Sequence, residues 1–354
     1  MKFCENKKLQ LKETLKDLLK VSSPSGKERY MTAHIKPIVE PYAEEVFYDN
    51  YGNLIVKVGG KGQKLMLCAH VDELGYWVKT ITEDGFLNVT KVGIPDKCVE
   101  AREVMVNGTI PGIVGTKAAH LQTPEERLKL VNPREIFIDI GVTSKAEAEA
   151  LGVRTGSYAS PIYNYMEMHN PDLVCCRALD DRAGCAVLIE LLKSIDKSAL
   201  QYELYIVFTL QEEVGLRGAT AAVNYLCPDK MIAVDTVPCA DTPGMNWKRD
   251  LPVQLGHGLV CSMSEGMGPM NFIHPEMEEK IFGLSEKYDI PVQPLSLCGF
   301  SASTDALAGS IQGRGVTAAT LTIPRRYSHS PVELMHINDA LAMLEMLSRF
   351  VVEA

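Results

Sequence analysis

Apolar residues along the chain fall into two patterns that alternate with each other. A strand buried on both faces reads as a near-continuous apolar run, and such runs occupy residues 64–69, 204–210, 231–234 and 316–323. Helices with one buried face show apolar residues at helical spacing, as in residues 9–20, 185–195, 277–288 and 337–352. The alternation predicts an α/β fold in which helices flank a buried sheet.

The pattern changes between residues 76 and 163, where shorter alternating segments are separated by Gly, Pro and Asp turns. A short helix is expected at residues 145–151, and strands are expected at residues 76–81, 86–92, 103–110, 112–115 and 135–140. We therefore expect a small β-rich domain at residues 74–163. It would be inserted into a larger domain formed by residues 1–73 and 164–354.

Composition narrows the class of protein. The 354 residues carry a net charge of −9, which argues against nucleic acid or an anionic membrane as the main partner. No apolar run approaches the length of a membrane span, and the first residues do not resemble a secretory signal. The ten cysteines include no CxxC pair and mostly lie in apolar runs. These features predict a protein of the reducing cytoplasm.

Acidic residues and histidines follow the predicted strands. Four strand ends and one helix start carry such residues: His70 and Asp72, Glu212 and Glu213, Asp235, His329, and the pair Asp180 and Asp181. Taken singly, each is explained by a solvated turn or, for the Asp pair, by helix capping. Capping needs one Asp, however, so the pair leaves a carboxylate for other work. Carboxyl ends of parallel strands are also where open α/β sheets place their chemistry.

The whole set is suited to a pair of metal ions. Two histidines with three or more carboxylates can hold two divalent ions about 3.5–4 Å apart, bridged by a carboxylate and a water. The ions lower the pKa of the shared water and so supply a hydroxide nucleophile near neutral pH. A spare carboxylate is then needed to take the proton and pass it to the leaving group.

Five motifs together resemble the di-metal glutamyl, or tetrahedral, aminopeptidases, a cytosolic family that includes deblocking aminopeptidases. The motifs are Ala-His70-Val-Asp72-Glu-Leu-Gly, Ala-Leu-Asp180-Asp181-Arg-Ala-Gly, Gln-Glu212-Glu213-Val-Gly-Leu-Arg-Gly, Ala-Val-Asp235 and Pro-Arg-Arg-Tyr-Ser-His329-Ser-Pro. They occur in the family's order. The resemblance implies a mixed sheet flanked by helices, with the inserted β-rich domain serving dimerisation and assembly. It also implies homo-oligomers, commonly tetrahedral dodecamers.

The resemblance also implies roles for individual residues. The metal ligands would be His70 and Asp235 for one ion, Glu213 and His329 for the other, and Asp180 as the bridge. Glu212 would act as general base and acid, and Asp72 would orient His70. The ions would be Zn²⁺ or Co²⁺, or else Mn²⁺. The peptide bond after the bridging Asp is often cis in this family.

These features predict a metallo-aminopeptidase that removes N-terminal residues from short peptides with a metal-bridged hydroxide. Further candidates for substrate contact are Arg326, Tyr327, Asp305 and His120. An N-acyl deacylase or a carboxypeptidase could use the same metal pair. An endoglucanase-type glycosidase is weaker, because sugar hydrolysis usually needs two carboxylates and no metal. A binding protein without catalytic activity would not need Glu212 in addition to the metal ligands.

Overall fold

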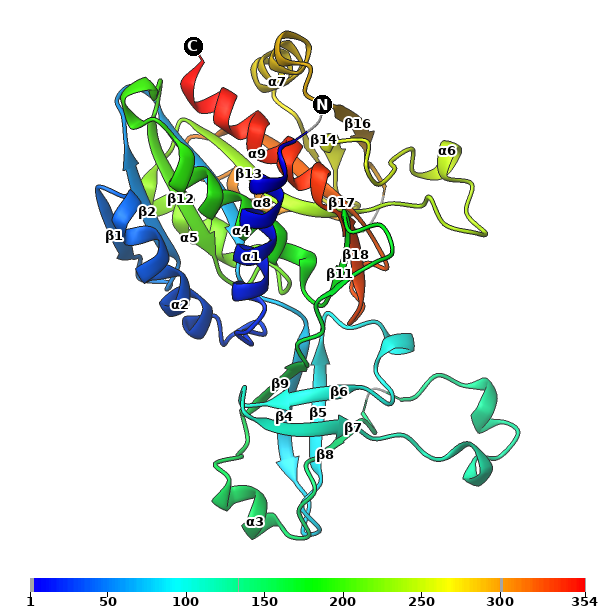
Figure 1. The fold of residues 1–354 in the computed structure, drawn as a ribbon. Coiled ribbons are helices and arrows are strands. Elements are labelled where there is room, and N and C mark those ends of the chain that lie inside the picture. Colours follow the sequence, from blue (N-terminus) through cyan, green and yellow to red (C-terminus); the bar gives the residue numbers. More distant parts are fainter. Residues whose placement is uncertain (1–2, 133, 300–301, 354) are drawn as a thin grey trace.

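The computed structural model describes residues 3–132, 134–299 and 302–353. A large α/β domain carries a smaller closed β-barrel on one side, and a long loop extends from the barrel (Figure 1). The expected fold class is confirmed, because a mixed sheet flanked by helices accompanies a small β-rich domain.

Twelve strands of the described chain form the sheet of the larger domain. Its main path runs through β1 (Glu45–Tyr48), β2 (Leu54–Gly59), β12 (Glu203–Thr209), β3 (Lys64–His70), β13 (Lys230–Pro238), β17 (Thr317–Arg326), β18 (Glu333–His336), β11 (Leu173–Cys176) and β10 (Met166–Glu167). A branch from β17 holds β14 (Leu259–Glu265), which pairs with β15 (Asn271–Phe272) and β16 (Val292–Ser296). Strands β12, β3, β13 and β17 are parallel, so their carboxyl ends share one edge.

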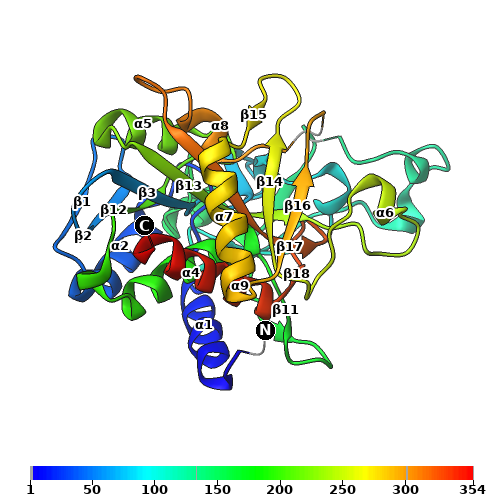
Figure 2. The ribbon, with the colours of Figure 1, turned by 90° about the horizontal axis from the view of Figure 1, so that it is seen from above.

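Helices cover both faces of this sheet (Figure 2). One face packs against α1 (Glu5–Leu18), α2 (Arg29–Val39), α4 (Leu179–Ser194), α7 (Pro275–Tyr288) and α9 (Ile337–Val352). The other face packs against α5 (Arg217–Leu226) and α8 (Asp305–Gly309). The short α6 (Trp247–Asp250) lies outside these two layers.

The apolar run in β12 shows why the central strands lack a polar face. Leu204, Ile206 and Phe208 belong to the larger core, beneath the five-helix layer. Tyr205 and Val207 belong to the core under α5 and α8. Successive side chains of a strand point to opposite faces, so a strand covered on both sides needs apolar residues throughout.

The barrel closes through six strands in the order β4 (Gly75–Ile81), β5 (Leu87–Val92), β8 (Phe137–Asp139), β7 (Ile110–Val114), β6 (Glu103–Val106) and β9 (Tyr158–Pro161). The helix α3 (Lys145–Ala150) lies between β8 and β9. The expected single strand over residues 103–110 is wrong. Asn107 and Gly108 have φ values of +51° and +76°, so the chain turns there and β7 begins at Ile110.

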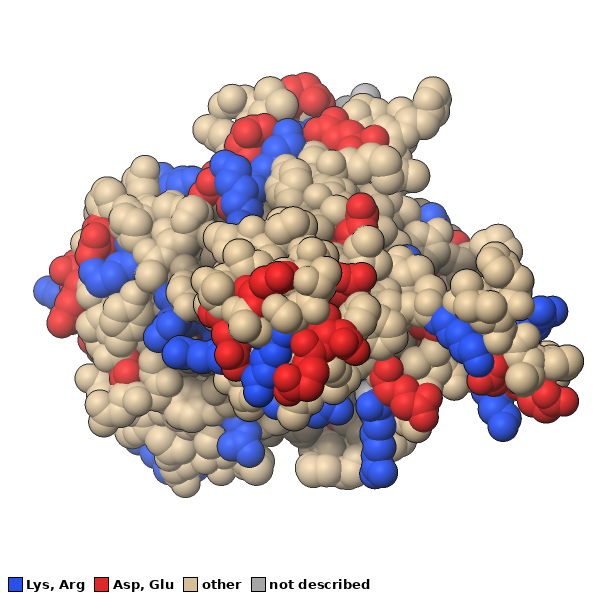
Figure 3. Space-filling view, turned by 90° about the horizontal axis from the view of Figure 1, so that it is seen from below, with Lys and Arg blue, Asp and Glu red and all other residues tan. Residues whose placement is uncertain are grey.

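Seen from the barrel side, acidic and basic side chains are interspersed over the surface (Figure 3). This face offers no broad basic area of the kind that binds a phosphate backbone. Within the described ranges, no helix has both the length and the apolar character needed to cross a membrane.

Candidate metal centre

Strand geometry places the first candidate ligands at one edge of the sheet. His70 is the last residue of β3, and its side chain continues the row of Met66 and Cys68. Asp235 continues the corresponding row of Met231 and Ala233 on β13. Asp235 was expected at a strand end, but β13 runs on to Pro238. The neighbouring rows nevertheless bring the imidazole of His70 and the carboxylate of Asp235 to within 3.9 Å.

The start of α4 separates the two adjacent aspartates by function. Asp181 Oδ1 accepts a hydrogen bond of 2.9 Å from the backbone N–H of Gly184, which is a capping contact. Asp180 has non-helical backbone angles, and the peptide bond that follows it is cis. The carboxylate of Asp180 faces the sheet edge instead, where it contacts His70.

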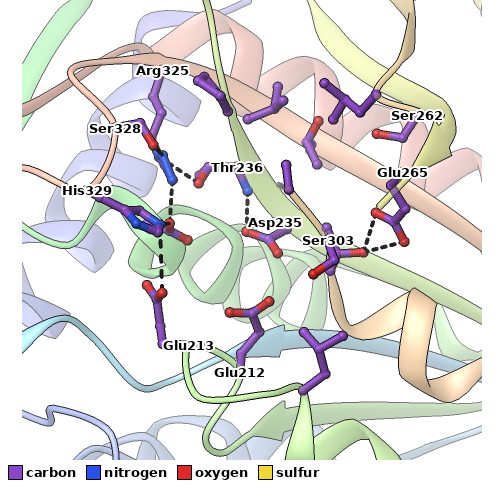
Figure 4. Close-up of a pocket in the computed structure, with 18 of the residues that line it drawn as sticks. Glu212, Glu213, Asp235, Thr236, Ser262, Glu265, Ser303, Arg325, Ser328 and His329 are labelled. Carbon is purple, nitrogen blue, oxygen red and sulfur yellow. Dashed lines mark hydrogen bonds and ion pairs between the residues drawn. The ribbon is translucent and has the colours of Figure 1, made fainter. Parts of the chain in front are cut away.

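Asp180 presents one oxygen to each of the two candidate histidines. Its Oδ1 lies 3.0 Å from His70 Nε2, and its Oδ2 lies 3.2 Å from His329 Nε2. His329 Nε2 is also 3.7 Å from Glu213 Oε2 (Figure 4). A carboxylate between two imidazoles in this way has the arrangement of a bridging ligand.

The donor set fits two ions of the kind that the sequence suggests. In the part of the chain that the structure describes, three overlapping groups have ligand atoms close enough together to hold an ion: His70, Asp180 and Asp235; Asp180, Glu213 and His329; and His70, Glu212 and Glu213. The first two groups share Asp180 and do not use Glu212. Oxygen and imidazole donors of this type suit zinc and related divalent ions. Among the described residues, Glu213 Oε1 is buried without a hydrogen-bond partner. An ion at this position would satisfy it.

Burial and mutual repulsion disturb the titration of the clustered acids. Burial, with a contribution from Asp180, raises the pKa of Glu213 to about 7 and that of Asp235 well above its usual value. Burial likewise raises the pKa of Glu212. Burial opposes ionisation of Asp180 too, but Arg325 and the two histidines outweigh it and hold its pKa well below the ordinary value. Such opposed shifts within one cluster are typical of functional sites.

Asp72 connects the two strand ends that carry His70 and Glu212. Its carboxylate accepts hydrogen bonds from the backbone N–H groups of Glu212, at 2.9 Å, and Glu213, at 3.2 Å. Ser25 Oγ donates a third, at 2.7 Å. Asp72 Oδ1 lies 3.4 Å from His70 Nδ1, whose nearer neighbour is the carbonyl oxygen of Asp72 at 3.1 Å. Asp72 therefore fixes the loop of the two glutamates as well as the imidazole.

A cavity of about 500 Å³ opens beside the cluster. Asp180, Glu212, Glu213, Asp235 and His329 line one end of it. The remaining wall is mixed in character and includes Thr236, Ser262, Glu265, Leu297, Thr304 and Thr322. Figure 4 shows Glu212 and Asp235 facing each other across this space, with Glu265 at the far side. The volume suffices for an amino-acid side chain and the adjoining peptide group.

The sequence model of the M42 glutamyl aminopeptidases matches residues 52–346, a range that contains the whole cluster. The chain belongs to this family. The resemblance suggested by the five motifs is thereby confirmed.

Relatives and solved structures agree with the family match over nearly the full length. The lysyl aminopeptidase of Pyrococcus furiosus is 31% identical, and the match covers 95% of this chain and 97% of that protein. The structure of an aminopeptidase from the archaeon Desulfurococcus kamchatkensis has a TM-score of 0.90 at 31% identity, covering 98% of this chain and 96% of that one. The TET1 peptidase of Pyrococcus horikoshii has a TM-score of 0.85 at 30% identity, covering 97% and 100%.

Four residues of this M42 chain that were considered as substrate contacts lie outside the cavity lining. Arg326 Nε and Nη2 each donate a hydrogen bond of 2.8 Å to the carboxylate of Asp241. Tyr327 is 55% exposed, and His120 lies in an exposed turn of the barrel loop. Asp305 is buried and accepts a hydrogen bond of 2.6 Å from Thr209 Oγ1. Substrate contact by these four stays a prediction.

Three charged residues of this site were missed from the sequence. Arg325 binds Asp180, and Glu333 accepts hydrogen bonds from the backbone N–H groups of Asp180, at 3.1 Å, and His329, at 2.8 Å. Glu265 lines the cavity although it is 1% exposed. Glu265 is the last residue of β14 and Arg325 lies next to the end of β17, so both occupy the strand-end position that singled out the other candidates.

Proposed function

We propose that the protein is a metallo-aminopeptidase that removes the N-terminal residue from short peptides. The observation that carries this proposal is the position of Asp180 between His70 and His329, with a spare glutamate and a cavity beside it. Family membership supports the same reaction class. Two divalent ions bound here, Zn²⁺ or Co²⁺ or else Mn²⁺, would polarise the scissile carbonyl group and make water a nucleophile near neutral pH.

The residues of the site would have two roles, metal binding and proton transfer. His70 and Asp235 would hold one ion, Glu213 and His329 the other, and Asp180 both. Glu212 Oε2 lies 4.0 Å from His70 Nε2 and lines the cavity. We assign to Glu212 the transfer of a proton from water to the leaving amine, because it lines the cavity beside His70 and burial raises its pKa above the ordinary value.

The rival reactions predict other substrates. A deacylase would cleave peptides whose N-terminus is acylated, and a carboxypeptidase would release the last residue. A glycosidase would work through two carboxylates and would not need the two imidazoles that flank Asp180. No feature of the described cavity favours these rivals over an aminopeptidase.

The test uses purified protein on matched short peptides with free and with N-acetylated N-termini. Each peptide is incubated after chelation and again after Zn²⁺ or Co²⁺ has been restored. Metal-dependent loss of single residues from free N-termini, followed by mass spectrometry, is the expected result. Cleavage of the acetylated peptides, or release of the C-terminal residue, would contradict the proposal.

Assembly into a homo-oligomer belongs to the same proposal. The TET1 peptidase of Pyrococcus horikoshii is described as assembling into a tetrahedron or a large octahedral shell. That protein matches this chain along its whole length, barrel included. We propose that the barrel, at residues 74–163, serves dimerisation and assembly here too, and that a tetrahedral dodecamer is the product.

A further inference from the structure

Arg325 is a buried cation directly against the proposed bridging ligand. It is 2% exposed and lies next to the end of β17. Its Nη2 donates to Asp180 Oδ2, the same oxygen that faces His329. Arg326, the next residue, pairs instead with Asp241. Of these two adjacent arginines, Arg325 therefore contacts a candidate metal ligand, whereas Arg326 does not.

The remaining contacts of Arg325 hold it in this position. Nε donates a hydrogen bond of 2.8 Å to Thr236 Oγ1, and Nη1 donates one of 2.8 Å to Ser328 Oγ. Nε also lies 3.4 Å from Glu333 Oε1. Three directions of the planar guanidinium are therefore fixed at once, which leaves it little freedom to move away from Asp180.

The two halves of the cluster differ in their exposure to this charge. The half formed with His70 and Asp235 uses Asp180 Oδ1, which Arg325 does not contact. The half formed with Glu213 and His329 uses Asp180 Oδ2, which already accepts from the guanidinium. A fixed positive charge at a shared oxygen draws electron density from it and repels a second cation in a low-dielectric site.

We infer that Arg325 makes the two metal positions unequal, so that the ion held by Glu213 and His329 binds at least tenfold more weakly than the ion held by His70 and Asp235. This inference rests on the two-ion centre of the proposed function. As the free metal concentration rises, the position held by His70 and Asp235 would fill first. The position held by Glu213 and His329 would fill last.

The test is a Co²⁺ titration of the chelated full-length protein, without peptide. Visible absorption reports the coordination of each ion, and equilibrium dialysis with elemental analysis gives the number bound. The wild-type protein is expected to bind two ions in two resolved steps. Arg325→Gln, which keeps hydrogen-bond donors but loses the charge, is expected to tighten the second step at least tenfold and to change the first less than threefold.

Two further variants separate charge from packing. Arg325→Lys keeps the positive charge and is expected to keep the weak second step. Arg326→Gln removes the neighbouring guanidinium and is expected to leave both steps as in the wild type. Unresolved, equally tight steps in the wild type, or an unchanged second step in a folded Arg325→Gln, would overturn the inference. Because no peptide is present, these outcomes are independent of whether the protein cleaves free N-termini.

Discussion

At the scale of single residues, Glu212 differs from its neighbour Glu213 in what faces it. Glu213 Oε2 lies 3.7 Å from His329, within the second ligand group. Glu212 lies against His70 and Asp235 and lines the cavity. These surroundings support the separate tasks that we propose for the two adjacent residues, Glu213 as a ligand and Glu212 as the base.

Replacing Glu212 by Gln is expected to lower kcat at least 100-fold while two ions per chain are retained. The amide cannot accept a proton from water, whereas the five other side chains still supply the ligands. Peptide hydrolysis and elemental analysis on the same preparation check both parts. Glu286→Gln, an exposed position on α7, is the matched control. Normal turnover in Glu212→Gln would remove this residue from the mechanism.

Glu265 gives a prediction about pH. Burial raises its pKa from 4.5 to about 7, although the hydroxyl groups of Thr304 and Thr320 bond to it. Between pH 4.5 and pH 7, the Glu265 carboxyl group therefore keeps its proton in the folded state and loses it in the unfolded chain. The resulting stability is complete below pH 4.5 and is lost as the pH rises through 7.

The contribution of Glu265 to the free energy of unfolding should fall by about 2–3 kcal/mol between pH 5 and pH 8. Urea unfolding of the wild type and of Glu265→Gln at matched pH values isolates it, because the other groups titrate alike in both proteins. The free energy of unfolding of the wild type is expected to fall relative to that of the variant. A difference that stays constant with pH would contradict the shifted pKa of Glu265.

The residue-scale features were predictable from sequence to different degrees. Polar residues at the ends of apolar runs pointed to His70 and Glu212, because buried strands tolerate such residues mainly at their ends. Arg325 also lies next to a strand end, but its pairing with Asp180, 145 positions away in the sequence, was not predictable. Pairings of this kind depend on how the strands are placed beside one another, which local pattern does not specify.

At the scale of elements, the loop between β12 and α5 depends on very close packing at its base. Gly218 N–H donates a hydrogen bond of 2.8 Å to the carbonyl oxygen of Leu210. Asn53 Oδ1 accepts from Leu210 N–H at 3.0 Å, and Asn53 Nδ2 donates to Gly218 O at 2.9 Å. These hydrogen bonds join the two ends of the loop, at Leu210 and Gly218, both directly and through Asn53. The closed loop holds Glu212 and Glu213 toward the candidate ligands.

Gly218→Ala is expected to destabilise the protein by about 1–3 kcal/mol and to lower kcat. An added Cβ would lie 2.4 Å from the backbone N and O of Leu210, so the base of the loop must open. Thermal unfolding and peptide hydrolysis measure the two effects. Gly283→Ala is the control: its Cβ has no heavy atom within 4 Å, and Ala favours the helix there. Equal behaviour of the two variants would refute the argument.

Element boundaries were less predictable than element types. The outer helix α7 was expected close to where it lies. The end of β6 and the extension of β13 were not, because they depend on a turn at Asn107 and on the pairing of β13 with β17. A strand can continue past a polar residue when its neighbour continues beside it.

At the scale of the whole molecule, the long loop between β7 and β8 carries exposed leucines away from the barrel (Figure 1). Leu121, Leu128 and Leu130 are 67%, 90% and 56% exposed along it. Exposed apolar residues grouped on one segment are typical of a contact surface. This feature agrees with the proposed role of the inserted domain in assembly.

Leu128→Glu is expected to reduce the mass of the assembly, because a charge at the most exposed of these leucines would be buried without a partner. Light scattering after size-exclusion chromatography gives the mass, and circular dichroism checks that the subunit remains folded. An unchanged mass would show that this loop does not form an interface.

The barrel also leaves and re-enters the larger domain at neighbouring points. Strand β4, which begins at Gly75, pairs antiparallel with β9, which ends at Pro161, and Tyr76 lies opposite Ala159. Insertions whose two ends lie together can be gained, exchanged or removed without shifting the host fold. In evolutionary terms the barrel is a cassette in the sequence between His70 and Asp180, one that can change without moving either residue.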